Sequence, residues 1–348
     1  MGNMANSKKY MKQYRAKRKS QEIMLKQYIH ERTRVNSLEN MCIELNELDG
    51  KQIRCDEIPI IFNSIAHKEK LVQFRINLQN NNIRDEGISY LFASLSKCTK
   101  LQSFHISLGQ NCIGDQGVFY LVQGLNQLKQ LERVSLFLQN NQITSNGVDY
   151  FQSLQENLNL RSLSLSLSKN YIGIYMDKLV SKLGQCFPNI KEFEFFSQNC
   201  ELTNAGANML ANKLSTLKNL ESLSLYLDSN SITDNGTTTL VRVICQFQGL
   251  TKLSLNFCES KVQDVNSYFS PLNVFSDKCV LQMLQDFSTH LKLSKLNLSM
   301  KSYSHRDYLN FLKNGFEALE KEEETNKQEM SFFVESKYGD KQSYIIYI

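Results

Sequence analysis

The sequence predicts an α/β solenoid of about eight repeats plus caps, with parallel strands on the concave side and helices on the convex side. Two observations predict it. A hydrophobic residue opens a new unit about every 30 residues, and within each unit the hydrophobic period changes from two residues to about four. The units begin at Leu71, Leu101, Leu131, Leu160, Ile190, Leu220 and Leu250.

Each unit reads as one strand, one turn and one helix. Leu163, Leu165 and Leu167 alternate with serines, as in a strand that is buried on one face. In the preceding units, residues such as Ile113 and Leu121 recur at helical spacing. A single unit cannot cover its own apolar face, so we expect stacked units to share one continuous core.

In five units a polar residue stands two places before a glycine that recurs at the same position of the repeat. We predict that this residue is the N-cap of the helix, because short polar side chains accept hydrogen bonds from free helix N–H groups. These residues are Asp85, Asp115, Ser145, Asn204 and Asp234.

An asparagine stands ten residues after most unit starts, where the strand bends toward the helix. Its amide can donate to and accept from the backbone of adjacent coils, so we predict a ladder of buried amides. The unit from Ile190 has Cys200 at this place, and the unit from Leu250 has Ser260. The asparagines are Asn81, Asn111, Asn141, Asn170 and Asn230.

The combined pattern, Leu-x-x-Leu-x-Leu-x-Leu-x-x-Asn-x-Ile-x-x-x-Gly-x-x-x-Leu-x-x-x-Leu, resembles the leucine-rich repeat. It is most similar to the long subclass found in ribonuclease inhibitor and Ran GTPase-activating protein. The resemblance covers residues 41–320 and implies a horseshoe. An extra Leu-x pair departs from the familiar form and implies a longer strand.

Three regions follow from these patterns. Residues 1–40 form a basic, partly helical N-terminal arm. Residues 41–320 form the repeat array, with an N-terminal cap, an insertion near 262–276, and helices over 276–289 and 309–319. Residues 321–348 hold the end of an acidic run and a hairpin that caps the last strand.

Charge is concentrated in the arm. Residues 1–40 hold 10 Lys or Arg against three acidic residues, a net charge of +7, whereas the remainder holds 30 against 32. A near-neutral body argues against a nucleic-acid surface along the whole fold. The arm is either a solvated tail or a contact for an acidic protein, nucleic acid or anionic membrane. Its candidate residues are Lys8, Lys9, Lys12, Arg15, Lys17, Arg18 and Lys19.

The start of the chain offers one modification alternative. Gly2 followed by a polybasic stretch resembles an N-myristoylation signal, although Asn6 stands where Ser or Thr is usual.

Catalytic and metal-binding patterns are not found in the sequence. The five histidines are scattered, and the nine cysteines contain no Cys-x-x-Cys pair. We therefore predict no enzymatic activity, no metal, no cofactor and no small-molecule substrate. Six cysteines that recur at repeat spacing are predicted to be buried thiols: Cys98, Cys112, Cys186, Cys200, Cys245 and Cys258. A cytoplasmic location is expected, with association with a cytoskeletal or ciliary assembly as an alternative.

The strand face is the candidate binding surface. Phe137, Phe196 and Tyr226 alternate with buried leucines, so they should project from this face, and Ser166 should leave a gap for a partner's apolar side chain. The alternative is that these rings stack on one another or pack against residues 262–275. Other predicted contacts are Arg75, His105, Glu194 and Asp228; a solvated surface histidine is the competing interpretation of His105.

These features favour a non-enzymatic protein-binding scaffold that holds a partner on its concave face. Two alternatives remain. The resemblance to the Ran regulator implies a GTPase-activating protein for a small G protein, with Arg84 as its candidate basic residue. The chain could also be a structural subunit of a cytoskeletal or ciliary assembly.

Overall fold

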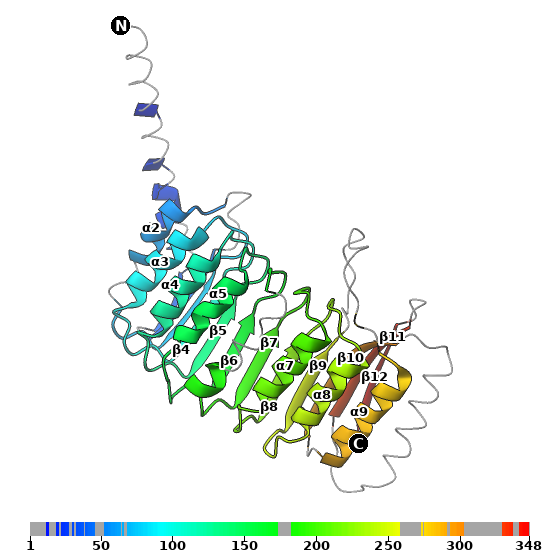
Figure 1. Ribbon diagram of the computed structural model, residues 1–348. Coiled ribbons are helices and arrows are strands. Elements are labelled where there is room, and N and C mark those ends of the chain that lie inside the picture. The colour runs from blue at the N-terminus through cyan, green and yellow to red at the C-terminus, as the bar shows by residue number, and fades with distance from the viewer. Residues whose placement is uncertain are drawn as a thin grey trace.

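The computed structural model describes residues 12–13, 19–20, 22–27, 30, 33–37, 39–45, 52–63, 65, 68–172, 182–257, 273, 275–290, 293–302, 329–336 and 341–347. Strands and helices alternate along most of this length (Figure 1). The strands are β1 (Thr33–Ser37), β2 (Asn40–Glu44), β3 (Gln73–Asn77), β4 (Ser103–Ser107), β5 (Arg133–Phe137), β6 (Ser162–Ser166), β7 (Glu192–Phe196), β8 (Ser222–Tyr226), β9 (Lys252–Asn256), β10 (Lys295–Ser302), β11 (Glu329–Ser336) and β12 (Lys341–Tyr347). The helices are η1 (Cys55–Glu57), α2 (Ile58–Asn63), α3 (Arg84–Leu95), α4 (Asp115–Leu125), α5 (Ser145–Tyr150), η2 (Phe151–Ser153), α7 (Asn204–Leu214), α8 (Asp234–Ile244) and α9 (Asp277–His290).

The strands form one 12-stranded sheet in sequence order. Neighbouring pairs from β2 to β11 are parallel, while β1 and β12 pair antiparallel with the strands at the two ends. The helices lie together on one face (Figure 1). Helices are about 10 Å wide and strands are spaced about 4.8 Å apart, so the strand face is the shorter, concave side. The predicted α/β solenoid of leucine-rich repeats is confirmed.

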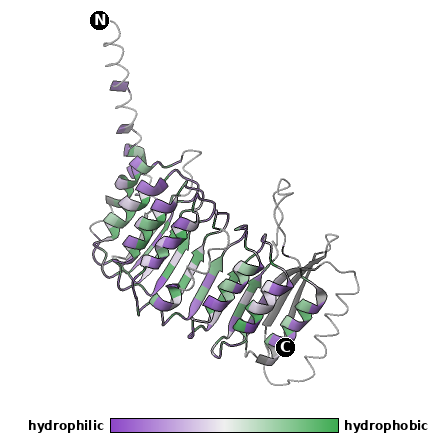
Figure 2. Ribbon diagram, in the orientation of Figure 1, coloured by the Kyte–Doolittle hydropathy of each residue, from purple (hydrophilic) through white to green (hydrophobic). Residues whose placement is uncertain are grey.

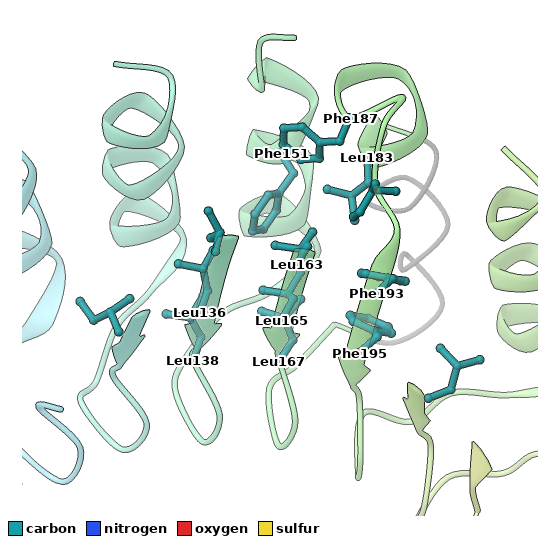
Figure 3. Close-up of a cluster of buried hydrophobic side chains, with 14 of the residues drawn as sticks. Leu136, Leu138, Phe151, Leu163, Leu165, Leu167, Leu183, Phe187, Phe193 and Phe195 are labelled. Carbon is teal, nitrogen blue, oxygen red and sulfur yellow. The ribbon is translucent and has the colours of Figure 1, made fainter. Parts of the chain in front are cut away.

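The core runs through the space between the strands and the helices. Consecutive strands pair without a shift, so Leu136 lies between Ile106 and Leu165 in the sheet. All three are buried, and Figure 3 shows the leucine and phenylalanine rows of the central repeats. Figure 2 shows the same alternation as hydrophobic and hydrophilic bands on strands and helices. Burying one such leucine contributes about 1.5–3 kcal/mol.

The extra Leu-x pair of each repeat does not lengthen the strand itself, but the hydrogen bonds between adjacent coils continue beyond the end of the strand. Strands β3 to β9 have five residues each. The backbone N–H of Leu78 nevertheless donates to the carbonyl of Ser107 (2.8 Å), and that of Asn80 donates to Gly109 (2.9 Å). The ladder then ends at a left-handed residue, since Asn80 has φ 59° and each later turn repeats this conformation. The repeated residues are Gln110, Asn140, Lys169, Asn199 and Ser229.

The buried asparagine ladder is confirmed. The Asn111 amide donates to the carbonyls of Leu78 (2.8 Å) in the previous coil and Leu108 (3.0 Å) in its own. Its oxygen accepts from the N–H of Ile83 at 3.2 Å. In the position of Cys200 a thiol replaces the amide and donates to the carbonyl of Leu167 at 3.3 Å.

One rung of the ladder differs from the sequence prediction. Ser260 lies outside the described residues, and Asn273 takes the ladder position of its repeat. The Asn273 amide donates to Leu227 (2.8 Å) and Phe257 (3.0 Å), and its oxygen accepts from Ile232 N–H (2.9 Å). The insertion therefore falls between the strand and the asparagine, and the ladder continues beyond it.

None of the five predicted N-caps is the N-cap of its helix. The N-cap is the preceding residue in α4, α5, α7 and α8, such as Gly114 in α4, and it is Ile83 in α3. Four of the five, all except Ser145, accept a hydrogen bond from the next repeat. Asp115 is the first helical residue of α4, and its carboxylate accepts from the Thr144 N–H at 2.7 Å and from the Thr144 hydroxyl at 2.7 Å. Asp85 accepts from Gly114 N–H in the same way (2.7 Å). These carboxylates couple adjacent helices.

At the ends of the array, β1 precedes the first parallel strand, and β11 and β12 follow β10 as an antiparallel pair. Helix α9 begins and ends one residue after the predicted 276–289. The predicted helix over 309–319, the acidic run and most of the insertion lie outside the described residues.

Candidate partner-binding surface

The open face of the sheet carries a continuous row of rings across β4, β5, β7 and β8. We name it the aromatic row: His105, Phe137, Phe196 and Tyr226. Ring centroids lie 5.2 Å apart between His105 and Phe137 and 6.0 Å apart between Phe137 and Phe196. Phe196 and Tyr226 are stacked, with centroids 4.2 Å apart and planes at 7°. All four side chains are partly exposed.

The gap predicted at Ser166 is closed. Ser166 lies on β6 between the two phenylalanines, but it is only 4% exposed. Phe137 and Phe196 reach toward each other over the short serine, which brings their rings to 6.0 Å. The prediction of a gap was therefore wrong, and the open face presents a ridge of rings in its place.

A carboxylate lies beside this ridge. Glu194 on β7 accepts a hydrogen bond from the Ser164 hydroxyl at 2.7 Å. Burial raises the pKa of the Tyr226 phenol, the charge of Glu194 raises it further, and a hydrogen bond with Ser254 lowers it. The negative charge of Glu194 therefore acts on the phenol of the stacked Tyr226 ring.

The N-terminal end of the row has a different electrostatic environment. Arg75 on β3 is exposed and pairs in the sheet with His105. Burial lowers the pKa of His105, the charge of Arg75 lowers it further, and Glu44 opposes both. At neutral pH His105 is consequently an uncharged ring that continues the aromatic row.

Asp228 differs from its prediction. Its side chain is only 4% exposed, at the turn that follows β8. Its backbone carbonyl accepts from Asn199 N–H (3.1 Å) and from the Asn230 amide (3.2 Å). Asp228 is part of the turn structure and does not present a carboxylate on the open face.

Two of the seven predicted arm residues lie in the described part of the chain. Lys12 and Lys19 are helical and exposed. The arm is anchored further along, where Leu25 is 6% exposed and packs in the core. The other five, Lys8, Lys9, Arg15, Lys17 and Arg18, lie outside the described residues.

Of the six cysteines predicted to be buried, three are buried, Cys245 is half-buried, and Cys258 lies outside the described residues. Cys98, Cys186 and Cys200 are buried, and burial raises the pKa of Cys200 to about 12. Cys112 is exposed, contrary to the prediction, because its φ of 55° places it in an outward turn after the ladder asparagine. The eight described cysteines are free of disulfides.

Arg84 stands at the start of α3, where it is exposed and has φ 55°. Its guanidinium donates to the Asn82 side chain at 2.9 Å, within its own loop. In the described part of the chain, no group of three or more His, Cys, Asp or Glu side chains is arranged to hold a metal ion. No helix there is both long and apolar enough to cross a membrane.

Sequence reasoning missed two further columns of the open face. Glu192 precedes Glu194 by one pleat on the same side of β7. On the other side of the aromatic row, the Ser168 hydroxyl donates to the Gln198 side chain at 2.5 Å. Both columns could have been found by extending the alternation one pleat in each direction, since side chains two apart share a face.

Together, the in-register ladder and the strand face define a leucine-rich-repeat solenoid with an open strand face. No protein-family model matches the chain. No curated protein matches it either. Two solved structures are similar to it: the yeast Rad7 and Elc1 complex (TM-score 0.39, 16% identity, covering 79% of this chain and 68% of that chain) and the TLR13–ssRNA13 complex (TM-score 0.36, 19% identity, covering 76% and 37%). The likeness is distant, so the fold assignment rests on the internal geometry of the repeats.

Proposed function

We propose that this protein is a non-enzymatic scaffold that binds a protein partner on its strand face. The aromatic row carries the proposal. Its rings form a contiguous apolar ridge on the open side of the sheet, flanked by serine and glutamate columns. Such ridges on soluble proteins mark interaction sites, and aromatic anchors at interface centres supply much of the binding energy.

The proposed contact surface is centred on Phe196 and Tyr226, with Phe137 on one side. Arg75, His105 and Glu194 would supply polar contacts at its edges, and the basic arm would supply a second contact with an acidic protein. Nucleic acid and anionic membrane remain the alternatives for the arm.

Three further points concern the repeat subclass, the location of the protein and its place in an assembly. The 30-residue helical repeat favours the long subclass of leucine-rich repeats. The disulfide-free state of the eight described cysteines supports a reducing, cytoplasmic location. Scaffold and subunit of a larger assembly are variants of one function, since both need a stable protein contact on the open face.

Capture from native extract tests the proposal. The full chain, Phe196→Ala and Tyr90→Ala are immobilised in parallel and bound proteins are quantified by mass spectrometry. Tyr90 is the matched control, because it is 47% exposed on α3, on the opposite face. We expect at least one protein to be lost with Phe196→Ala and retained with Tyr90→Ala. If no captured protein distinguishes the two variants, the strand face is not the binding surface.

The control for folding is the melting temperature of each variant. Removal of the Phe196 ring ends its stack with Tyr226, which costs about 0.5–1.5 kcal/mol beyond the lost area, so a modest decrease in melting temperature is expected. Binding is compared well below the lower melting temperature.

A further inference from the structure

The open face of β7 presents two carboxylates and a ring in a line: Glu192, Glu194 and Phe196. The strands on both sides present short hydroxyl side chains at the two glutamate levels. Glutamate side chains are longer than serine side chains, so the two carboxylates project beyond the serine hydroxyls around them. We call these serines, which lie beside the aromatic row, the polar bed. The bed consists of Ser162 and Ser164 on β6 and Ser222 and Ser224 on β8.

Glu194 uses only part of its hydrogen-bonding capacity. Its Oε2 accepts from Ser164 at 2.7 Å, and in the part of the chain that the structure describes no second donor to this carboxylate is found. A carboxylate has two oxygens and about four acceptor sites. The half-buried group therefore keeps capacity for a donor that arrives from outside.

No cation of the described residues neutralises this carboxylate. The ion pairs in that part of the chain lie elsewhere. Arg133 on β5 and Lys252 on β9 are the nearest basic residues at the level of Glu192, each two strands from β7. Two strand spacings are about 10 Å, so neither is placed to pair with Glu194 one pleat further on.

An apolar surface lies next to the Glu194 carboxylate. Phe196 and Tyr226 are stacked at 4.2 Å and are both partly exposed. The negative charge of Glu194 raises the pKa of the Tyr226 phenol, which places the carboxylate within electrostatic reach of the stack. Carboxylate and rings together fit a side chain that has a long apolar stem and a cationic end.

We propose that Glu194 and the Phe196–Tyr226 stack receive an arginine side chain of the protein partner. This inference rests on the proposed function and names the chemistry of the bound side chain. Arginine fits better than lysine, because its planar guanidinium donates in a fixed fork to a carboxylate and is more weakly hydrated, so it packs against rings at less cost. The arginine stem covers the ring stack while its guanidinium bonds the unused side of the Glu194 carboxylate.

A display library of random 12-residue peptides, selected on the full-length protein, is the probe. We expect arginine to be enriched in the selected peptides. For the tightest peptide, Glu194→Gln should weaken binding about 10- to 100-fold, because a hydrogen bond to a charged group is lost. Replacing the peptide arginine by citrulline, which keeps the shape and removes the charge, should weaken binding as much. Combining both changes should add little, since they remove one interaction.

Glu201→Gln is the matched control, because Glu201 is an exposed glutamate in the turn after β7. It should leave peptide affinity unchanged. Melting curves of Glu194→Gln confirm that the variant is folded.

Two results separate this inference from the proposed function. Arginine-poor peptides that need Phe196 but bind Glu194→Gln normally would overturn the arginine site and leave the strand-face scaffold intact. Peptides whose affinity is unchanged by Glu194→Gln and by Phe196→Ala would overturn the arginine site and the strand-face scaffold together. A selection that yields no binding peptide would also overturn the two proposals.

Discussion

Removal of one rung of the asparagine ladder should destabilise the array strongly. In Asn141→Ala the lost side chain would leave four backbone partners that lie within 3.0 Å, besides a longer contact with the Gln139 carbonyl. Its oxygen accepts from the N–H groups of Asn111 (2.9 Å) and Ile113 (3.0 Å), and its amide donates to the carbonyls of Leu108 (3.0 Å) and Leu138 (2.9 Å). The site is buried, with Asn141 only 6% exposed, so water cannot replace these bonds without opening the turn.

The magnitude follows from the contacts. Each hydrogen bond contributes about 1 kcal/mol net, so four lost bonds cost about 4 kcal/mol, and more if both N–H groups stay unsatisfied. At about 2–4 °C per kcal/mol, the melting temperature should decrease by about 8–16 °C. Gln142→Ala is the control, because Gln142 is exposed and adjacent in sequence, and it should shift the melting temperature by less than about 2 °C.

The assay is thermal unfolding followed by far-ultraviolet circular dichroism, with urea unfolding at 25 °C as a second measure. If Asn141→Ala melts within 2 °C of the control variant, the ladder does not hold adjacent coils together, and the reasoning from hydrogen-bond geometry is refuted.

Three further predictions concern charge. Burial raises the pKa of the Cys200 thiol from 9.0 to about 12, so the folded state binds this proton more tightly than the unfolded state does. The free energy of unfolding should therefore decrease as the pH rises from about 9 toward 12, and it should decrease less steeply in Cys200→Ser. Equal slopes for the two proteins in urea titrations would contradict the burial argument. Glu194→Gln should lower the pKa of Tyr226, because a negative charge that disfavours the phenolate is removed; an unchanged Tyr226 titration by NMR would count against the placement of that carboxylate. Deletion of residues 1–24, which ends before the buried Leu25, removes a net charge of +6 and should weaken partner or membrane association and flatten its salt dependence. Identical co-sedimentation across a salt series would leave the arm as a solvated tail.

The fold could be predicted because its determinants repeat. The unit starts recur so regularly that one register accounts for the buried rows, and the ladder role of Asn111 follows from its position alone. The rung at Asn273 was missed because the insertion separates it from its strand. A search for the next Asn-x-hydrophobic step ahead of a helix would have found it, since Phe275 follows Asn273 by two residues.

The details of the candidate site were less accessible, for physical reasons. Alternation assigns each side chain to a face, but it does not set rotamers, so the approach of Phe137 and Phe196 over Ser166 could not be derived. Capping rules are local in sequence, whereas Asp115 accepts from Thr144 in the next repeat. The burial of Asp228 depends on the packing of its turn and not on its place in the alternation.

Photo-crosslinking from the aromatic row shows directly whether a protein binds the strand face. p-Benzoylphenylalanine replaces Tyr226 in one full-length variant and Tyr90 on the helix face in another, and each is irradiated in native extract. We expect a discrete protein adduct from position 226 and none from position 90. An adduct from position 90 together with none from position 226 would place the partner on the helix face and overturn the proposed strand-face scaffold.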